Sequence, residues 1–153
     1  MKNLKLLLSR RLKPIPRWLP YVLAILPLVG FVDSVYLTVS RFLNFSLPCT
    51  VFHGCDVVTR SAYSTIGTVP VALLGAVYYL ALLLIAINVI ESSRNDVLYL
   101  YKQISWCGLI FSAWFMSVQA FILNAYCTYC IISAIDCAIL FVLSLLYIKV
   151  NKQ

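Results

Sequence analysis

Four long runs of apolar residues, almost free of charged side chains, dominate the chain. Each has roughly the 20 residues that an α-helix needs to cross a hydrocarbon core about 30 Å thick. Because unpaired backbone groups are costly in lipid, all four are predicted to be helical. We therefore predict an all-α integral membrane protein, a four-transmembrane-helix bundle over residues 19–148. The predicted spans are Leu19–Ser40, Val69–Ile90, Ile104–Leu123 and Cys127–Ile148.

Composition and charge support this picture and add an orientation. The chain is 63% hydrophobic and only 11% charged, with a net charge of +7. Ten of its twelve basic residues lie before the first run, between the second and third, or after the fourth; only Arg41 and Arg60 fall elsewhere. The positive-inside rule then places a basic N-terminus (1–18) and a short C-terminus (149–153) in the cytoplasm, with the loop 41–68 outside. The basic excess indicates topology and lipid contact rather than nucleic-acid binding.

The six cysteines divide into two groups by their place in this topology. Cys107 and Cys137 lie inside predicted spans, where a free cysteine usually packs as a small hydrophobic residue. The remaining four gather at the predicted outer surface, as one pair in the loop and one pair where the fourth run begins. These are Cys49, Cys55, Cys127 and Cys130.

The second pair forms a Cys-x-x-Cys motif, Cys127-Thr128-Tyr129-Cys130. On a helix this spacing brings both sulfurs to one face, and a helix start, with Asn124 as the expected N-cap, favours a thiolate. Turn-forming residues such as Pro48 and Gly54 surround the loop pair and favour irregular, mobile structure there. A mobile pair beside a fixed pair predicts a thiol–disulfide relay.

Electrons collected by such a relay need an acceptor, and the chain has neither a dinucleotide fingerprint nor a haem-attachment motif. A quinone dissolved in the membrane fits this requirement by elimination. Helical spacing groups candidate contacts on two faces, which would form an apolar pocket with one or two polar groups. The predicted quinone contacts are Val71, Leu74, Tyr78, Phe115 and Gln119.

The motifs, in their order and positions, resemble those of the vitamin K epoxide reductase family over about residues 19–148. The resemblance implies that Cys49 and Cys55 shuttle electrons, that Cys127 and Cys130 reduce the quinone, and that Ser61 supplies a supporting hydroxyl. The matching motifs are Cys49-x5-Cys55, Ser61, Gly75-Ala-Val-Tyr78-Tyr79 and Tyr126-Cys127-Thr-Tyr-Cys130-Ile131.

Departures from the animal members narrow what the resemblance implies. Animal members hold the quinone with an asparagine and a tyrosine where this chain has Val71 and Ala134, which argues against epoxide reduction. Bacterial relatives reduce ubiquinone or menaquinone and oxidise an exported thioredoxin-like protein. The expected protein is therefore a disulfide-generating enzyme of a bacterial cytoplasmic membrane, whose thioredoxin-like partner is a separate protein because the sequence ends at Gln153.

Three alternatives remain open from the sequence. Asp33 and Asp136 lie within predicted spans and could couple protons to transport in a small four-helix transporter. The external cysteines could instead form two inert structural disulfides. A zinc site that includes His53 is disfavoured by the loose Cys-x5-Cys spacing, and no metal is expected.

The predicted topology can be tested by labelling. A membrane-impermeant thiol reagent, added to intact cells after reduction, is expected to modify Cys49 or Cys55, because the loop 41–68 is placed outside. Labelling would be followed by mass spectrometry. If these cysteines react only after lysis, the orientation is inverted.

Overall fold

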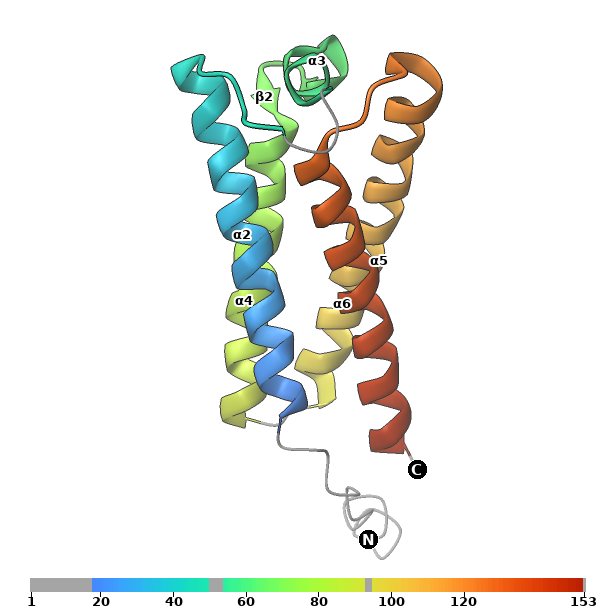
Figure 1. The fold of residues 1–153 in the computed structure, drawn as a ribbon. Helices are drawn as coiled ribbons and strands as arrows, with labels where there is room; N and C mark the ends of the chain where they lie inside the picture. Colours follow the sequence, from blue (N-terminus) through green and yellow to red (C-terminus); the bar gives the residue numbers. More distant parts are fainter. Residues whose placement is uncertain (1–17, 50–53, 93–94, 153) are drawn as a thin grey trace, which may run out of the picture.

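The computed structural model describes residues 18–49, 54–92 and 95–152. Four long helices stand side by side as a bundle, and α2 begins at the end where α6 finishes (Figure 1). All four are long and apolar enough to cross a membrane, and many large apolar side chains face outward. The predicted all-α, four-helix membrane bundle is confirmed. Its helices are α2 (Leu19–Leu43), α4 (Val71–Ser92), α5 (Asn95–Val118) and α6 (Thr128–Lys152).

The largest difference from the predicted spans is at the start of the third helix. It begins at Asn95 rather than Ile104. The predicted span was a charge-free run, so it left out Asp96 and Lys102. A helix can continue past charged residues near a membrane surface, because long basic side chains extend toward water. The helix therefore extends beyond the apolar stretch by which it was recognised.

Short elements connect α2 to α4 and cover one end of the bundle, which we call the α3 end (Figure 1). Ile66 pairs with Val69 in an antiparallel hairpin, and Gly67 adopts the positive φ of 64° that its tight turn requires. The elements are α3 (Cys55–Arg60), the 3-10 helix η1 (Ala62–Ser64), β1 (Thr65–Ile66) and β2 (Val69–Pro70).

The expectation of irregular structure around the second loop cysteine is wrong, because α3 begins at Cys55 itself. Asp56 in its first turn and Arg60 in its last turn have the charges that suit the helix dipole at each end. Thr59 further closes the helix, since its hydroxyl donates to the Cys55 carbonyl oxygen at 2.8 Å. The turn-forming residues thus flank a short helix rather than an open loop.

Arg41 fastens this covering layer to the bundle. Its guanidinium, at the end of α2, donates to the Thr59 carbonyl oxygen and to the Ser64 hydroxyl. The Ser64 hydroxyl also lies 2.7 Å from the carbonyl oxygens of Thr59 and Ser61. Hydrogen bonds to a charged group stabilise by about 1.5–3 kcal/mol each. One of the two basic residues outside the general charge pattern therefore has a structural role.

The centre of the bundle is packed around buried tyrosines that join different helices. The Tyr79 hydroxyl of α4 donates to the Ser133 carbonyl oxygen of α6 at 3.0 Å, and the Tyr101 hydroxyl of α5 donates to the Leu23 carbonyl oxygen of α2 at 2.9 Å. Gly30 leaves room for the Tyr79 ring, which a Cβ at that position would overlap. These contacts fix the helices that surround the site.

Candidate redox site

All four cysteines singled out at the surface meet in one buried cluster under α3. Cys55 is 1% exposed and Cys127 is 0% exposed, and both belong to the cluster, while Cys49 and Cys130 pack against it. Side chains from α2, α3 and the segment after α2 complete it: Leu37, Leu47 and Val58. The structure thus brings together two pairs that are more than seventy residues apart in the sequence.

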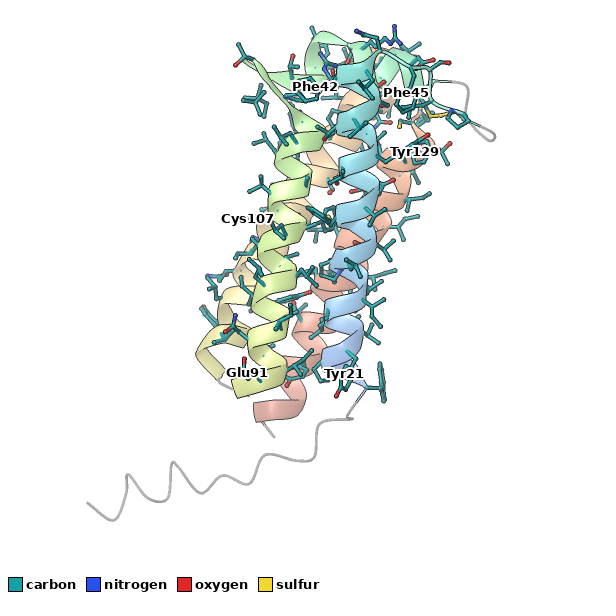
Figure 2. All side chains as sticks on the ribbon, turned by 90° about the vertical axis from the view of Figure 1, so that its left-hand side faces the viewer. Tyr21, Phe42, Phe45, Glu91, Cys107 and Tyr129 are labelled. Atoms are coloured by element: carbon teal, nitrogen blue, oxygen red, sulfur yellow. A yellow bond between two sulfur atoms is a disulfide. The ribbon has the colours of Figure 1, made fainter. Side chains whose placement is uncertain are left out.

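The two remaining cysteines lie apart from this cluster. Cys137 belongs to the core of the bundle, and Cys107 is exposed. Figure 2 shows Cys107 partway along the bundle, between Phe45 at the α3 end and Glu91 at the other end. The two cysteines predicted within spans therefore lie apart from the other four, but only Cys137 packs in the core as expected, because Cys107 is exposed.

The loop pair and the Cys-x-x-Cys pair differ in their bonding. Cys49 and Cys55 form a disulfide, whereas Cys127 and Cys130 are free thiols. In thiol–disulfide exchange a thiolate attacks a disulfide sulfur, so the two pairs supply both groups that the reaction needs. One oxidised pair and one reduced pair in the same cluster can exchange a disulfide without help from another group.

Two direct contacts bind the loop to the Cys-x-x-Cys motif, each next to a cysteine. Gly54 packs against the backbone of Tyr126, so closely that a Cβ on Gly54 would lie 2.9 Å from the Tyr126 nitrogen and oxygen. The Tyr129 hydroxyl donates a long hydrogen bond of 3.5 Å to the Pro48 carbonyl oxygen. The Tyr129 ring also packs on Tyr36 of α2, with 5.5 Å between the centroids. The approach of the two pairs is therefore built from their immediate neighbours.

The segment between α5 and α6 differs from the expected helix start. A π-helical turn, η2 (Gln119–Leu123), extends α5, and Asn124 closes that turn in the left-handed conformation. The prediction that Asn124 is the N-cap of the last helix is therefore wrong. Helix α6 begins at Thr128, and the Cys127 carbonyl oxygen accepts the Ile131 N–H at 3.0 Å. Cys127 itself occupies the position before the helix.

Gln119 does not lie where the predicted contact with the quinone would require it. Its side chain is 0% exposed, and its Oε1 accepts the Cys127 N–H at 2.9 Å. Its Nε2 donates a weak hydrogen bond of 3.7 Å to the Met116 sulfur. Gln119 does not line the cavity described below. Its polar atoms face the Cys-x-x-Cys segment instead.

The surroundings of Cys127 favour its thiolate. A hydrogen bond from the Cys130 thiol is the largest influence and lowers the pKa of Cys127 below its ordinary value. Burial opposes this, and the backbone amides of Cys130 and Tyr129 add to the lowering. Because a thiolate is both the nucleophile and the leaving group of thiol–disulfide exchange, a lowered pKa favours exchange at Cys127.

A cavity of about 370 Å³ lies beside the cluster, between the helices. Of the four clustered cysteines, only Cys130 lines it. The predicted contacts Val71, Leu74, Tyr78 and Phe115 all line it as well, and so does Ala134, one of the two positions that depart from the animal pattern. Its volume falls within the range of small-molecule sites. The Cys-x-x-Cys pair thus connects the buried cluster to a mostly apolar cavity.

Several polar side chains line the cavity, among them Tyr78, Arg41 and Ser64. The Tyr78 hydroxyl is buried and has no hydrogen-bond partner within the part of the chain that the structure describes. Gly108 of α5 gives this side chain its space, because a Cβ there would overlap the Tyr78 hydroxyl. Arg41 and Ser64 line the cavity toward the α3 end. Sequence reasoning had noted Arg41 only as an exception to the charge pattern and had not singled out Ser64.

Ser61, the predicted supporting hydroxyl, does not line the cavity. It ends α3, and its hydroxyl donates to the Val58 carbonyl oxygen at 2.8 Å. Ser61 therefore contacts the end of α3, the helix that carries Cys55, and its supporting role stays a prediction. Ser64 is the serine of this segment that lies at the cavity wall.

The comparison with protein families agrees with this geometry. A model of the vitamin K epoxide reductase family matches residues 21–145. The chain belongs to the vitamin K epoxide reductase family. A comparison with curated proteins finds no match. Membership identifies the protein as a membrane thiol–disulfide oxidoreductase, and the clustered cysteines are the groups able to perform that chemistry.

The groups behind the alternative hypotheses lie elsewhere. Asp33 and Asp136 each have a buried oxygen without a hydrogen-bond partner among residues 18–49, 54–92 and 95–152, and neither lines the cavity. His53 lies outside the described residues. Within the described ranges, no three His, Cys, Asp or Glu side chains are grouped as metal ligands. Neither a proton-coupled transport path nor a metal centre gains a specific observation in its favour.

The hydrogen bond between the two thiols leads to a prediction about this family member's reactivity. Cys130→Ala removes the donor that stabilises the Cys127 thiolate, so the pKa of Cys127 should rise. The pH of half-maximal Cys127 alkylation, followed by mass spectrometry, should move upward. Cys107→Ala, which removes a thiol outside the cluster, should leave that pH unchanged. An unchanged value in Cys130→Ala would show that the thiol pair does not set the reactivity of Cys127.

Proposed function

We propose that the protein is a thiol–quinone oxidoreductase that reoxidises an exported thioredoxin-like protein and reduces a membrane quinone. The observation that carries this proposal is the split placement of the Cys-x-x-Cys pair. Both residues belong to or pack against the cluster that contains Cys55, and of the two only Cys130 also lines the cavity. One pair therefore faces both the loop disulfide and a space suited to a small apolar acceptor.

The loop side of the reaction begins at Cys49, which is less buried than Cys55. A thiolate of the donor attacks the Cys49 sulfur, breaks the loop disulfide and releases Cys55 as a thiolate. The second donor thiol then attacks the mixed disulfide, which frees Cys49 and leaves the donor oxidised. Two electrons and the accompanying protons have moved from the donor to the loop pair.

The second exchange passes these electrons inward. The Cys55 thiolate attacks Cys127 of the oxidised Cys127–Cys130 disulfide and releases the Cys130 thiolate at the cavity. Cys49 then attacks Cys55, which restores the loop disulfide and frees Cys127. Two electrons and two protons pass from the Cys127–Cys130 dithiol to the quinone, giving a quinol and the Cys127–Cys130 disulfide.

The quinone head group would occupy the cavity, against Val71, Leu74 and Phe115. The Tyr78 hydroxyl would donate to a quinone oxygen, because it is buried and has no hydrogen-bond partner among the described residues, which is unfavourable. Leu74, Cys107 and Phe111 line the cavity and are also exposed on the outside of α4 and α5. A substrate dissolved in lipid, ubiquinone or menaquinone, would enter between those helices.

The orientation follows from the charge pattern. The α3 end lies on the outer side of a bacterial cytoplasmic membrane, and both termini lie in the cytoplasm. Ten basic residues on the other side support this orientation. The outer side is also where disulfides form and thioredoxin-like oxidants act.

Quinone reduction by the purified protein tests the proposal directly. With a reduced thioredoxin-like donor, the quinone absorbance should fall, with one quinol formed per donor disulfide. Cys130→Ala should abolish this reaction, because the Cys-x-x-Cys pair can then neither deliver a thiol to the cavity nor close its disulfide. Cys55→Ala should block the donor-driven reaction but allow reduction by a small dithiol that reaches the Cys127–Cys130 pair directly.

Ser117→Ala is a suitable control, since Ser117 is exposed and its hydroxyl only donates within its own helix, to the Ala113 carbonyl oxygen at 2.8 Å. It should react as the unchanged protein does. Full activity of both Cys130→Ala and Cys55→Ala would rule out the relay. An inert unchanged protein would favour structural disulfides.

A further inference from the structure

Gln119 is a fully buried amide inside an apolar helix end, and its side chain points away from the cavity. We propose that Gln119 is a positioning residue of the thiol relay, which holds residues 124–127 so that the Cys127 sulfur stays against Cys55. The inference rests on the proposed function, because positioning matters only if these two cysteines exchange. It replaces the sequence-based hypothesis that Gln119 binds the quinone.

Three backbone N–H groups of this four-residue segment end on Gln119. Its backbone carbonyl oxygen accepts the Asn124 N–H and, at 3.2 Å, the Ala125 N–H. Its side-chain oxygen accepts the Cys127 N–H at 2.9 Å. Since backbone donors buried without an acceptor are strongly unfavourable, the path of the segment is set by one residue.

The segment is confined from the opposite side by Gly54. A Cβ at Gly54 would lie 2.9 Å from the Tyr126 backbone nitrogen and oxygen and 3.0 Å from the Ala125 Cβ. Gly54 directly precedes Cys55, and Tyr126 directly precedes Cys127. Any displacement of the segment from Gln119 therefore changes how Cys127 meets Cys55, and neither Gln119 nor residues 124–127 line the cavity.

The side-chain contact also explains why an amide is needed at this position. Cys127 occupies the position before α6, so no earlier turn of that helix supplies an acceptor for its N–H. Leucine has about the same size as glutamine but no acceptor. Glutamate keeps an oxygen at the same reach and can still accept the Cys127 N–H.

The test compares Gln119→Leu, Gln119→Glu and Tyr78→Phe in donor-driven quinone reduction. Gln119→Leu should lower kcat roughly tenfold, as expected when a buried donor is stranded, and leave the quinone KM unchanged. Gln119→Glu should restore most of kcat. Tyr78→Phe should show the opposite pattern, a higher quinone KM with less effect on kcat. A raised KM and unchanged kcat in Gln119→Leu would return Gln119 to the quinone site and overturn the proposal.

A second readout needs neither donor nor quinone. Cys127 is 0% exposed, so its alkylation in the unchanged protein should be slow, and release of the segment in Gln119→Leu should speed it several-fold. Unaltered protection of Cys127 would overturn the positioning role even if the protein proved inactive toward quinones. Conversely, faster alkylation together with no quinone reduction by the unchanged protein would support positioning and reject the proposed function.

If Gln119→Leu does not fold, Gly54→Ala probes the same segment from its other side. The added methyl group should displace Tyr126, lower donor-driven kcat and leave the quinone KM unchanged. Normal kcat in a folded Gly54→Ala protein would show that the position of the segment does not limit exchange, and the proposal would be wrong.

Discussion

The packing of Cys55 and Cys127 in one buried cluster is the contact on which the rest of the site depends. Sulfurs exchange only when they can approach to bonding distance, and neither cysteine is accessible from outside. The close backbone approach of Gly54 to Tyr126 brings the two segments together. Arg41 holds α3 on the bundle from the other side, through Thr59 and Ser64. These contacts turn a connection between helices into a fixed layer over the thiols.

Membership in the family accounts for the thiol–disulfide chemistry. The geometry suggests how the Cys-x-x-Cys pair serves both the loop disulfide and the cavity. The Cys-x-x-Cys pair sits at the start of α6, so that both residues contact the cluster and Cys130 alone of the pair also lines the cavity. A rigid helix start keeps this arrangement. The hydrogen bond between the thiols lowers the pKa of Cys127 and so favours reaction on the cluster side.

The sequence predicted the helices well because length and apolar character alone determine which segments can cross a membrane. It also predicted which four cysteines lie together, since topology decides which of them share an end of the bundle. The face assigned to Gln119 failed for a physical reason. Regular helical spacing places Gln119 with Phe115, but the segment after the π turn η2 brings the Cys127 N–H back to the Gln119 side chain, which accepts it. Phe115 therefore lines the cavity while Gln119 faces Cys127.

Other features of the site could not be predicted because they depend on contacts between distant segments. The sequence predicts only a turn at Gly54, whereas in the structure its missing side chain lets the Tyr126 backbone pack against it. Ser61 matches the family motif, whereas Ser64 is the one that reaches the cavity wall, because the 3-10 turn η1 turns the chain between them. Local patterns identify chemical groups and helices, but a close approach between two loops leaves no periodic signal.

The claim that Cys55 and Cys127 are the sulfurs that exchange can be tested by trapping their disulfide. A protein with Cys49→Ala and Cys130→Ala retains only these two cysteines at the site, and mild oxidation should join them in nearly every molecule, as seen by mass spectrometry. The complementary protein, with Cys55→Ala and Cys130→Ala, should join Cys49 to Cys127 far more slowly. Equal rates in the two proteins, or no bond between Cys55 and Cys127, would contradict the account.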